Sequence, residues 1–253
     1  MTIPNITKIA QITLLFWIMK IVATTLGETL GDYLSMTLNL GYATGIGITF
    51  TFFVLILLVQ IYSKRYVPAV FWVVIIATTT LGTEISDYID RSLNLGYAVG
   101  SLLLSLGLLG VLIAWYWRYG NLSVTSLHEK PKELLFWIAV LFSNSLGTAF
   151  GDYLNDALGL SYLQGALVTA AVIISVVLLH YLTKINEIFL FWVAFVFTRP
   201  FGATFVDFLT KPVAKGGLDL GTFQASVVAI AIIACLIFWE HQNNKKALQI
   251  TNK

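Results

Sequence analysis

The chain has 253 residues, of which 58% are hydrophobic and 11% are charged, and its mean hydropathy is +0.84. A soluble domain has about 45–50% apolar and about 25% charged residues, so this composition excludes an ordinary soluble globular protein. The formal net charge of +2 is small, and no basic stretch is long enough to indicate a nucleic-acid partner.

Apolar segments long enough to cross a lipid bilayer follow one another along almost the whole chain. A transmembrane helix needs about 20 apolar residues, because each residue adds about 1.5 Å. The sequence predicts eight such helices, over residues 10–34, 42–62, 68–90, 97–118, 133–154, 161–182, 187–209 and 221–240. We therefore expect an all-α integral membrane protein with eight transmembrane helices in the lipid bilayer.

The predicted helices form four copies of one hairpin, and each first helix carries the same landmarks. Phe-Trp occurs at residues 16–17, 71–72, 136–137 and 191–192. A Gly follows each Trp after ten residues, at Gly27, Gly82, Gly147 and Gly202, and an Asp after fifteen, at Asp32, Asp87, Asp152 and Asp207. Because each copy holds two helices, all four enter the membrane from the same side. The hairpins are thus parallel tandem repeats, pseudo-symmetric about the membrane normal. The sequence leaves open whether they form a closed ring of four or a pair of pairs.

The longest polar linker, residues 118–132, divides the chain into two halves. The first half, 1–117, contains the hairpins 10–62 and 68–118, and the second, 133–253, contains the hairpins 133–182 and 187–240 and a short C-terminal tail.

Basic residues are concentrated in the termini and in the loops between hairpins. These are Lys8, Lys64, Arg65, Arg118, Lys130, Lys132, Lys184, Lys245, Lys246 and Lys253, whereas the turns within hairpins carry only Arg91, Lys211 and Lys215. By the positive-inside bias, we expect both termini and the linker in the cytoplasm.

Six carboxylates interrupt the apolar segments, although an ionised carboxylate at the bilayer centre costs about 2.5–3.5 kcal/mol or more. They are Glu28, Asp32, Glu84, Asp87, Asp152 and Asp207. Such groups face the bundle interior or water, and carboxylate and hydroxyl oxygens suit hard cations. We predict that these six side chains are the ligands of a metal ion or another cation.

Each first helix also carries a polar stripe on one face, which we predict to line a path for substrate or protons. The stripe comprises Thr24, Thr25, Thr79, Thr80, Asn144, Ser145 and Arg199, followed by Tyr33, Tyr88 and Tyr153 next to the Asp residues. The turn residues Tyr42, Tyr97 and Tyr162 are further candidates for an aromatic wall around an organic cation.

Structural roles are the alternative for the same residues. The repeated Asp would then cap the second helix of each hairpin or bond the turn, and Arg199 would be the counter-ion of Asp207, two turns away. The Trp residues would pack helices or anchor them at the membrane interface. Lys20 would extend its ammonium group to the cytoplasmic surface.

The combination of Phe-Trp, the Gly ten residues on, and "LGDYL" or "FGDYL" resembles a known family. It is that of uncharacterised bacterial "membrane-anchored" proteins of four tandem repeats, each with two transmembrane segments and a Trp. The second and fourth copies depart from the motif, with "ISDYI" and "FVDFL". The resemblance implies the topology and a bacterial inner membrane, but no activity.

Our first hypothesis is a secondary transporter of an inorganic hard cation such as Mn²⁺, Mg²⁺, Ca²⁺ or Na⁺, exchanged for protons at the carboxylates. An organic-cation transporter and a channel or structural membrane protein are the alternatives. We expect no cofactor other than a bound cation and no enzymatic activity, since no nucleophile–base pair is recognisable. Paired acids leave a lipid-directed enzyme open. The direction of transport, including export, and the oligomeric state are also open.

Overall fold

The computed structural model describes residues 8–125, 127 and 129–251, without the side chains of 215 and 244–251. Of the basic residues that predict the orientation, Lys215, Lys245, Lys246 and Lys253 lie outside these described side chains.

Eight long α-helices and no strand make up the described part of the chain. They are α1 (Leu14–Asp32), α2 (Tyr42–Tyr62), α3 (Pro68–Asp87), α4 (Gly96–Tyr119), α5 (Lys130–Asp152), α6 (Tyr162–Leu182), α7 (Glu187–Thr210) and α8 (Thr222–Thr251). All eight are long and apolar enough to cross a membrane. The prediction of an all-α fold with eight transmembrane helices is confirmed.

Local sequence explains where these helices begin and end. The Thr13 side chain accepts a hydrogen bond from the Phe16 N–H at the start of α1, and Pro68 begins α3, where a missing N–H costs nothing. The first three hairpins then continue past the Asp through one π-helical turn, which the sequence did not predict. These turns are η1 (Tyr33–Thr37), η2 (Tyr88–Ser92) and η3 (Tyr153–Ala157).

The "NLG" turns require backbone angles that few residues adopt. Asn39 and Asn94 have φ of 55° and 54°, and the following Gly41 and Gly96 have φ of 75° and 74°. Asn and Gly are the residues that tolerate this left-handed region best. The turns therefore reverse the chain directly after each π turn.

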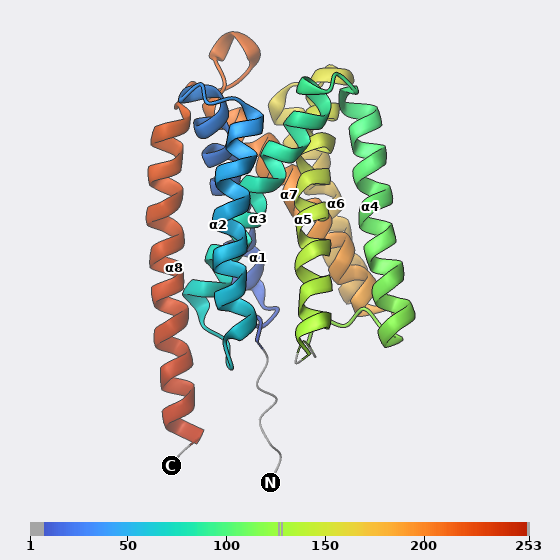
Figure 1. Cartoon of the computed structure of the whole chain (residues 1–253), viewed down its shortest axis with the longest axis vertical. Helices are drawn as coiled ribbons and strands as arrows, with labels where there is room; N and C mark the ends of the chain where they lie inside the picture. Colours follow the sequence, from blue (N-terminus) through green and yellow to red (C-terminus); the bar gives the residue numbers. More distant parts are fainter. Residues whose placement is uncertain (1–7, 126, 128, 252–253) are drawn as a thin grey trace.

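The four first helices form a closed ring. Helix α1 packs on α3, α3 on α5, α5 on α7, and α7 returns to α1. In the side view of Figure 1 the helices run along one common direction, with α8 and α4 at opposite sides of the bundle. Each second helix packs on the first helix of the following hairpin: α2 on α3, α4 on α5, α6 on α7 and α8 on α1. The hairpins thus interlock around the axis, which answers the question left open by the sequence: the backbone is a ring of four.

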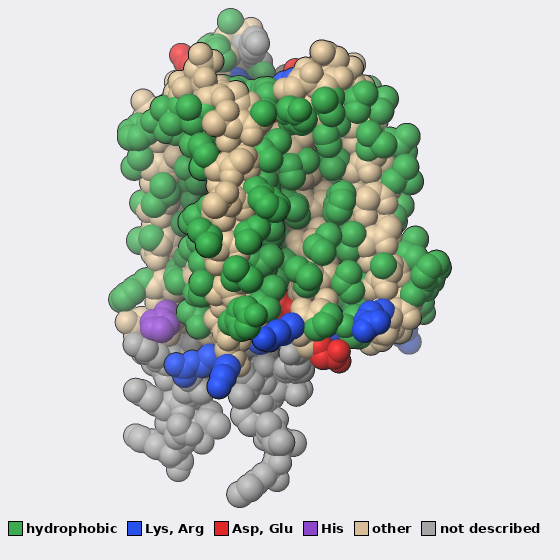
Figure 2. Space-filling view, in the orientation of Figure 1, with side chains coloured by type: hydrophobic (Ala, Val, Ile, Leu, Met, Phe, Trp, Pro, Cys, Tyr) green, Lys and Arg blue, Asp and Glu red, His purple; other side chains and the backbone are tan. Residues whose placement is uncertain are grey.

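Burial follows this arrangement. More than half of the residues in the apolar stretches of α1, α3, α5 and α7 are buried, against about a quarter in the four outer helices. Hydrophobic side chains are spread over the lateral face shown in Figure 2, between its two ends. This is the pattern expected when lipid surrounds the outer helices and the polar groups face inward.

The repeated Gly residues are the contact points between neighbouring ring helices. A Cβ on Gly82 would lie 2.9 Å from the Ser145 backbone nitrogen, closer than real Cβ atoms approach. Gly27 faces Thr79, Gly147 faces Arg199 and Gly202 faces Thr24 in the same manner. Small residues at these positions let the four helices pack closely.

The Phe-Trp pairs form a second ring of contacts at the end where α1 begins and α8 ends, which we call the terminal end. Each Phe packs on the Trp of the next hairpin. The centroid distances are 5.6 Å for Phe16–Trp72, 5.6 Å for Phe71–Trp137, 6.4 Å for Phe136–Trp192 and 5.8 Å for Phe191–Trp17. Such tilted contacts are favourable for aromatic rings. We call these eight residues the aromatic layer.

Candidate functional site

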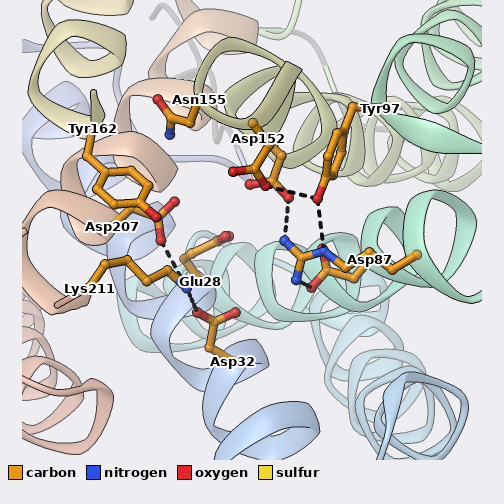
Figure 3. A pocket seen from close by; sticks show the side chains of 11 residues that line it. Glu28, Asp32, Asp87, Tyr97, Asp152, Asn155, Tyr162, Asp207 and Lys211 are labelled. Carbon is orange, nitrogen blue, oxygen red and sulfur yellow. Dashed lines mark hydrogen bonds and ion pairs between the residues drawn. The ribbon is translucent and has the colours of Figure 1, made fainter. Parts of the chain in front are cut away.

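The four repeated Asp residues meet at the opposite end, which we call the hairpin end. The first three are the last residues of their helices: Asp32 of α1, Asp87 of α3 and Asp152 of α5. Asp207 lies in the last turn of α7, and all four are buried. They line a cavity of about 270 Å³ (Figure 3). We call them the Asp ring.

Two basic side chains bridge members of the Asp ring. Arg91 lies 3.4 Å from the Asp87 carboxylate and 2.9 Å from that of Asp152. Lys211 lies 3.3 Å from Asp207 and 3.1 Å from Asp32. Each cation thus pairs with the Asp of its own hairpin and with that of the next. In the sequence, both residues are recognisable only as basic residues of the turns, because neither lies in the polar stripe.

The charge pattern has lower symmetry than the backbone. Arg91 and Lys211 are the nineteenth residues after Trp72 and Trp192, and the equivalent residues of the first and third hairpins are Met36 and Asp156. Cations therefore alternate with other groups around the ring. The placement of the two cations is therefore approximately two-fold symmetric within a ring of four hairpins.

Lys211 lies just outside the membrane-spanning part of α7. Burial alone would lower the pKa of its ammonium group, but the charges of Asp207 and Asp32 outweigh this effect and raise the pKa above its ordinary value. Lys211 therefore keeps its proton throughout the neutral range and remains a counter-ion of the Asp ring.

Tyrosines from the second helices complete the cavity wall. Arg91 donates hydrogen bonds to the hydroxyls of Tyr42 (3.0 Å) and Tyr97 (3.4 Å), and Tyr97 donates to Asp156 (2.9 Å). Tyr97 and Tyr162 line the cavity. The predicted pathway tyrosines are half-buried and are not among the residues that line it; they are Tyr33, Tyr88 and Tyr153.

A second charged layer lies one helical turn from the Asp ring, toward the terminal end. Arg199 forms an ion pair with Glu28 and also donates to the hydroxyls of Thr83 and Thr148, each at 2.6 Å. The expected pair of Arg199 with Asp207 is wrong, because Asp207 pairs with Lys211. Glu28, Thr83 and Thr148 are each the eleventh residue after a Trp, and Arg199 reaches this level from one turn earlier.

A third polar layer lies nearer to the terminal end. The Lys20 ammonium group donates to the Asn144 carbonyl (3.2 Å), and the Asn144 amide donates to Thr78 (3.0 Å) and Thr79 (3.2 Å). Lys20 is fully buried. The prediction that it extends to the surface is wrong, because Lys20 lies on the inner face of α1, where the ammonium group finds Asn144 and the ring of Phe195.

The rest of the polar stripe lies at the contacts between ring helices. The hydroxyls of Thr24, Thr79, Thr80 and Ser145 donate to carbonyls of their own helices, and Thr25 is half-buried. Hydroxyls bonded in this way are satisfied within lipid without a ligand. None of these five residues lines the cavity.

Glu84 lies off the axis. It is fully buried, a Cβ on Gly45 of α2 would lie 2.5 Å from its carboxylate, and neither oxygen has a hydrogen-bond partner among the described residues. Glu84 is the twelfth residue after Trp72 rather than the eleventh, which turns it about 100° around the helix relative to Glu28. The structure therefore separates Glu84 from the other five predicted ligands.

Basic side chains lie between the remaining carboxylates. Among the described residues, no group of three or more Asp, Glu, His or Cys side chains is arranged to hold a metal ion. Arg91, Lys211 and Arg199 take part in every ion pair of the Asp ring and Glu28 that the described residues form. Metal binding by these residues stays a prediction.

The fold and the polar axis define a multi-pass helical membrane protein with four internal repeats. A family model described as "Repeat of Unknown Function (DUF347)" matches residues 15–66, 70–121, 135–186 and 190–245. The chain belongs to this repeat family, and the predicted four-repeat resemblance is confirmed. No curated protein and no solved structure matches the chain.

Proposed function

We propose that this protein is a secondary transporter of a small cation in a bacterial inner membrane, with both termini in the cytoplasm. The observation that supports this function is the Asp ring, which lines an open polar cavity between membrane-spanning helices. Intramembrane ionisable groups that face a cavity are typical of substrate or ion pathways. Basic side chains at the terminal end, visible in Figure 2, support the orientation.

The charge balance of the cavity favours a cation. Its wall contains six carboxylates and two basic side chains: Glu28, Asp32, Asp87, Asp152, Asp156 and Asp207 against Arg91 and Lys211. Even with Arg199 as the partner of Glu28, acids exceed bases. Such an excess at membrane depth attracts cations from solution or retains protons.

The two ends of the axis differ in a way that suits transport. The cavity opens at the hairpin end, whereas the aromatic layer occupies the terminal end. A transporter that exposes its site to one side of the membrane at a time needs such an asymmetry. In this proposal the cation enters at the hairpin end and exchanges for protons at the carboxylates.

Inorganic and organic cations remain distinct versions of the proposal. A hard metal ion requires several oxygens that converge at about 2.0–2.6 Å, and the described carboxylates instead surround N–H donors. The tyrosine hydroxyls beside Arg91 are also suited to N–H donors. The geometry therefore supports an organic cation more strongly than a metal ion.

The test is transport by the purified full chain in lipid vesicles, with a pH-sensitive dye inside and a pH gradient across the membrane. Mn²⁺, Mg²⁺, Ca²⁺, Na⁺, methylammonium and methylguanidinium would be added separately. We expect one class to dissipate the gradient, and the Asp32→Asn and Asp152→Asn variants to lose this response.

The matched control is Glu187→Gln, which removes one carboxylate from an exposed position at the terminal end. It should transport like the wild type. A dye response that is the same in protein-free vesicles, or unchanged in both Asp variants, would refute the proposed function.

A further inference from the structure

The Asp ring has four neighbouring pairs, but the described basic side chains bridge only two of them. Arg91 bridges Asp87 and Asp152, and Lys211 bridges Asp207 and Asp32. Between Asp152 and Asp207, the repeat places Asp156 at the position of the basic residue. The junction of the third and fourth hairpins thus has a carboxylate at the position where the two bridged junctions have a basic side chain.

This junction forms a wall of the cavity. Asp156, Asn155 and Tyr162 all line it, and Figure 3 shows the Tyr162 ring beside Asp207. The Tyr97 hydroxyl donates to Asp156 at 2.9 Å. The junction therefore repeats the surroundings of Arg91, with two ring Asp residues and tyrosine hydroxyls from two second helices.

Asn155 gives an independent indication of a ligand. The residue is 7% exposed, and neither its amide nitrogen nor its amide oxygen has a hydrogen-bond partner within the described structure. Buried polar groups in proteins are nearly always hydrogen-bonded, so an amide left in this state at a cavity wall is suited to bind a partner from solution. The amide oxygen lies against Gly165 of α6, where an added Cβ would be 2.5 Å from it, and the residue also borders the cavity. Turned about its last torsion, the amide would direct this oxygen to the cavity, where it can accept a hydrogen bond from an N–H group.

We propose that the junction of the third and fourth hairpins, between Asp152, Asp156 and Asp207, binds the cationic group of the substrate, and that this group is an ammonium or guanidinium. The inference rests on the proposed function and adds the place and the chemical class. The repeat supplies the reason: the two equivalent junctions bind the guanidinium of Arg91 and the ammonium of Lys211.

The remaining junction lacks these features. Between Asp32 and Asp87 the equivalent residue is Met36, which is uncharged and, unlike Asp156, does not line the cavity. A thioether is a weak acceptor and offers no charge. The Met36 junction is therefore the internal control for the Asp156 junction.

The experiment compares Asp156→Lys with Met36→Lys in the full chain. Each variant adds one lysine at the offset where Lys211 already pairs with two Asp residues, so both should fold. Binding of methylguanidinium and methylammonium would be measured by calorimetry and by the shift in melting temperature. We expect Asp156→Lys to abolish binding and Met36→Lys to retain it.

Asp156→Asn serves as a milder second variant. Loss of one charge-assisted hydrogen bond should weaken binding by about tenfold or more. Melting temperatures without added cation check the folding of all three variants. Equal loss in Asp156→Lys and Met36→Lys, or unchanged binding in Asp156→Lys, would overturn the inferred place.

Other outcomes separate this inference from the proposed function. If Mg²⁺ or Na⁺ binds and neither organic probe does, the cation transporter stands and the ammonium or guanidinium class is overturned. If no cation binds the wild-type protein, the proposed function itself fails and the inference fails with it.

Discussion

Glu28 and Arg199 each replace a Thr of the repeat, one with a negative and the other with a positive side chain. The eleventh residue after the Trp is Thr in the second and third hairpins, and the seventh is Thr in the first and second. Glu28 replaces the former and Arg199 the latter. Because both side chains are buried and paired, each is the counter-ion that makes the other tolerable in the membrane.

The repeat itself suggests the variants that test this pair. Glu28→Thr or Arg199→Thr alone leaves an uncompensated buried charge and should lower the free energy of unfolding by about 3–5 kcal/mol. The double variant restores Thr at both offsets and should lose much less than the sum of the two. Unfolding in detergent, read as a double-mutant cycle, measures the coupling. Additive losses would contradict the pairing.

Lys211 should compete with an added cation for the Asp ring. Lys211→Met introduces the residue that the first hairpin has at this offset and frees Asp32 and Asp207. The half-buried ion pair should account for about 1–3 kcal/mol of stability. An added cation should restore this loss by mass action, so the melting temperature should rise more with cation in the variant than in the wild type.

The pH range for this comparison follows from the pKa of Lys211, which its two Asp partners raise. A raised lysine pKa gives stability that is fully present below the unfolded value of about 10.4 and is lost only as the pH rises beyond it. The ammonium group of the wild type is therefore charged between about pH 6 and 9. Lys184→Met, at an exposed site, is the control. Equal cation shifts in all three proteins would contradict competition.

At the scale of elements, the spacing of the ring helices depends on Gly. Each repeated Gly touches the next ring helix at its seventh and eighth residues after the Trp, where the polar stripe lies. The polar stripe predicted as a pathway is thus largely the surface on which these helices pack. Gly82 has the least room to adapt, because it faces backbone atoms of α5 rather than the end of a side chain.

Gly82→Ala should separate α3 from α5. The added Cβ would lie 2.9 Å from the Ser145 nitrogen, so the helices must move apart, at a cost of about 1–3 kcal/mol. Gly110→Ala in α4 is the matched control, because no atom lies within 4 Å of its added Cβ. Thermal unfolding in detergent compares the two, and equal stability would contradict the role of Gly82.

The same elements show which features of the structure could be predicted from the sequence. The helices and the four Asp residues follow from hydropathy and from a repeat that fixes which residues are equivalent. The partner of each second helix did not follow, because hydropathy does not tell whether α2 packs on α1 or on α3. The cations of the Asp ring were also missed. Arg91 and Lys211 lie in turns, and only the closed ring brings them to an Asp of the next hairpin.

At the scale of the whole molecule, polar contacts join different hairpins at the terminal end, around the aromatic layer. Glu240 of α8 accepts hydrogen bonds from Tyr66 (2.8 Å) and Trp72 (3.0 Å), which ties the fourth hairpin to the second. Burial and the Glu240 charge raise the pKa of Tyr66, so its hydroxyl stays a donor. Glu133 accepts from Lys8 at 2.9 Å. These contacts lie at the end opposite the Asp ring and its cavity.

The direction in which the Asp ring faces is therefore a property of the orientation of the whole chain. If the termini lie in the cytoplasm, as we propose, the cavity opens to the outside. In a Cys235→Ala background, we expect a membrane-impermeant maleimide to label Leu38→Cys, at the hairpin end, in intact cells. Lys64→Cys, at the terminal end, should be labelled only after permeabilisation; both positions are exposed. The opposite labelling pattern would show that the Asp ring faces the cytoplasm. The first step of the proposed transport would then be binding of a cation from the cytoplasm.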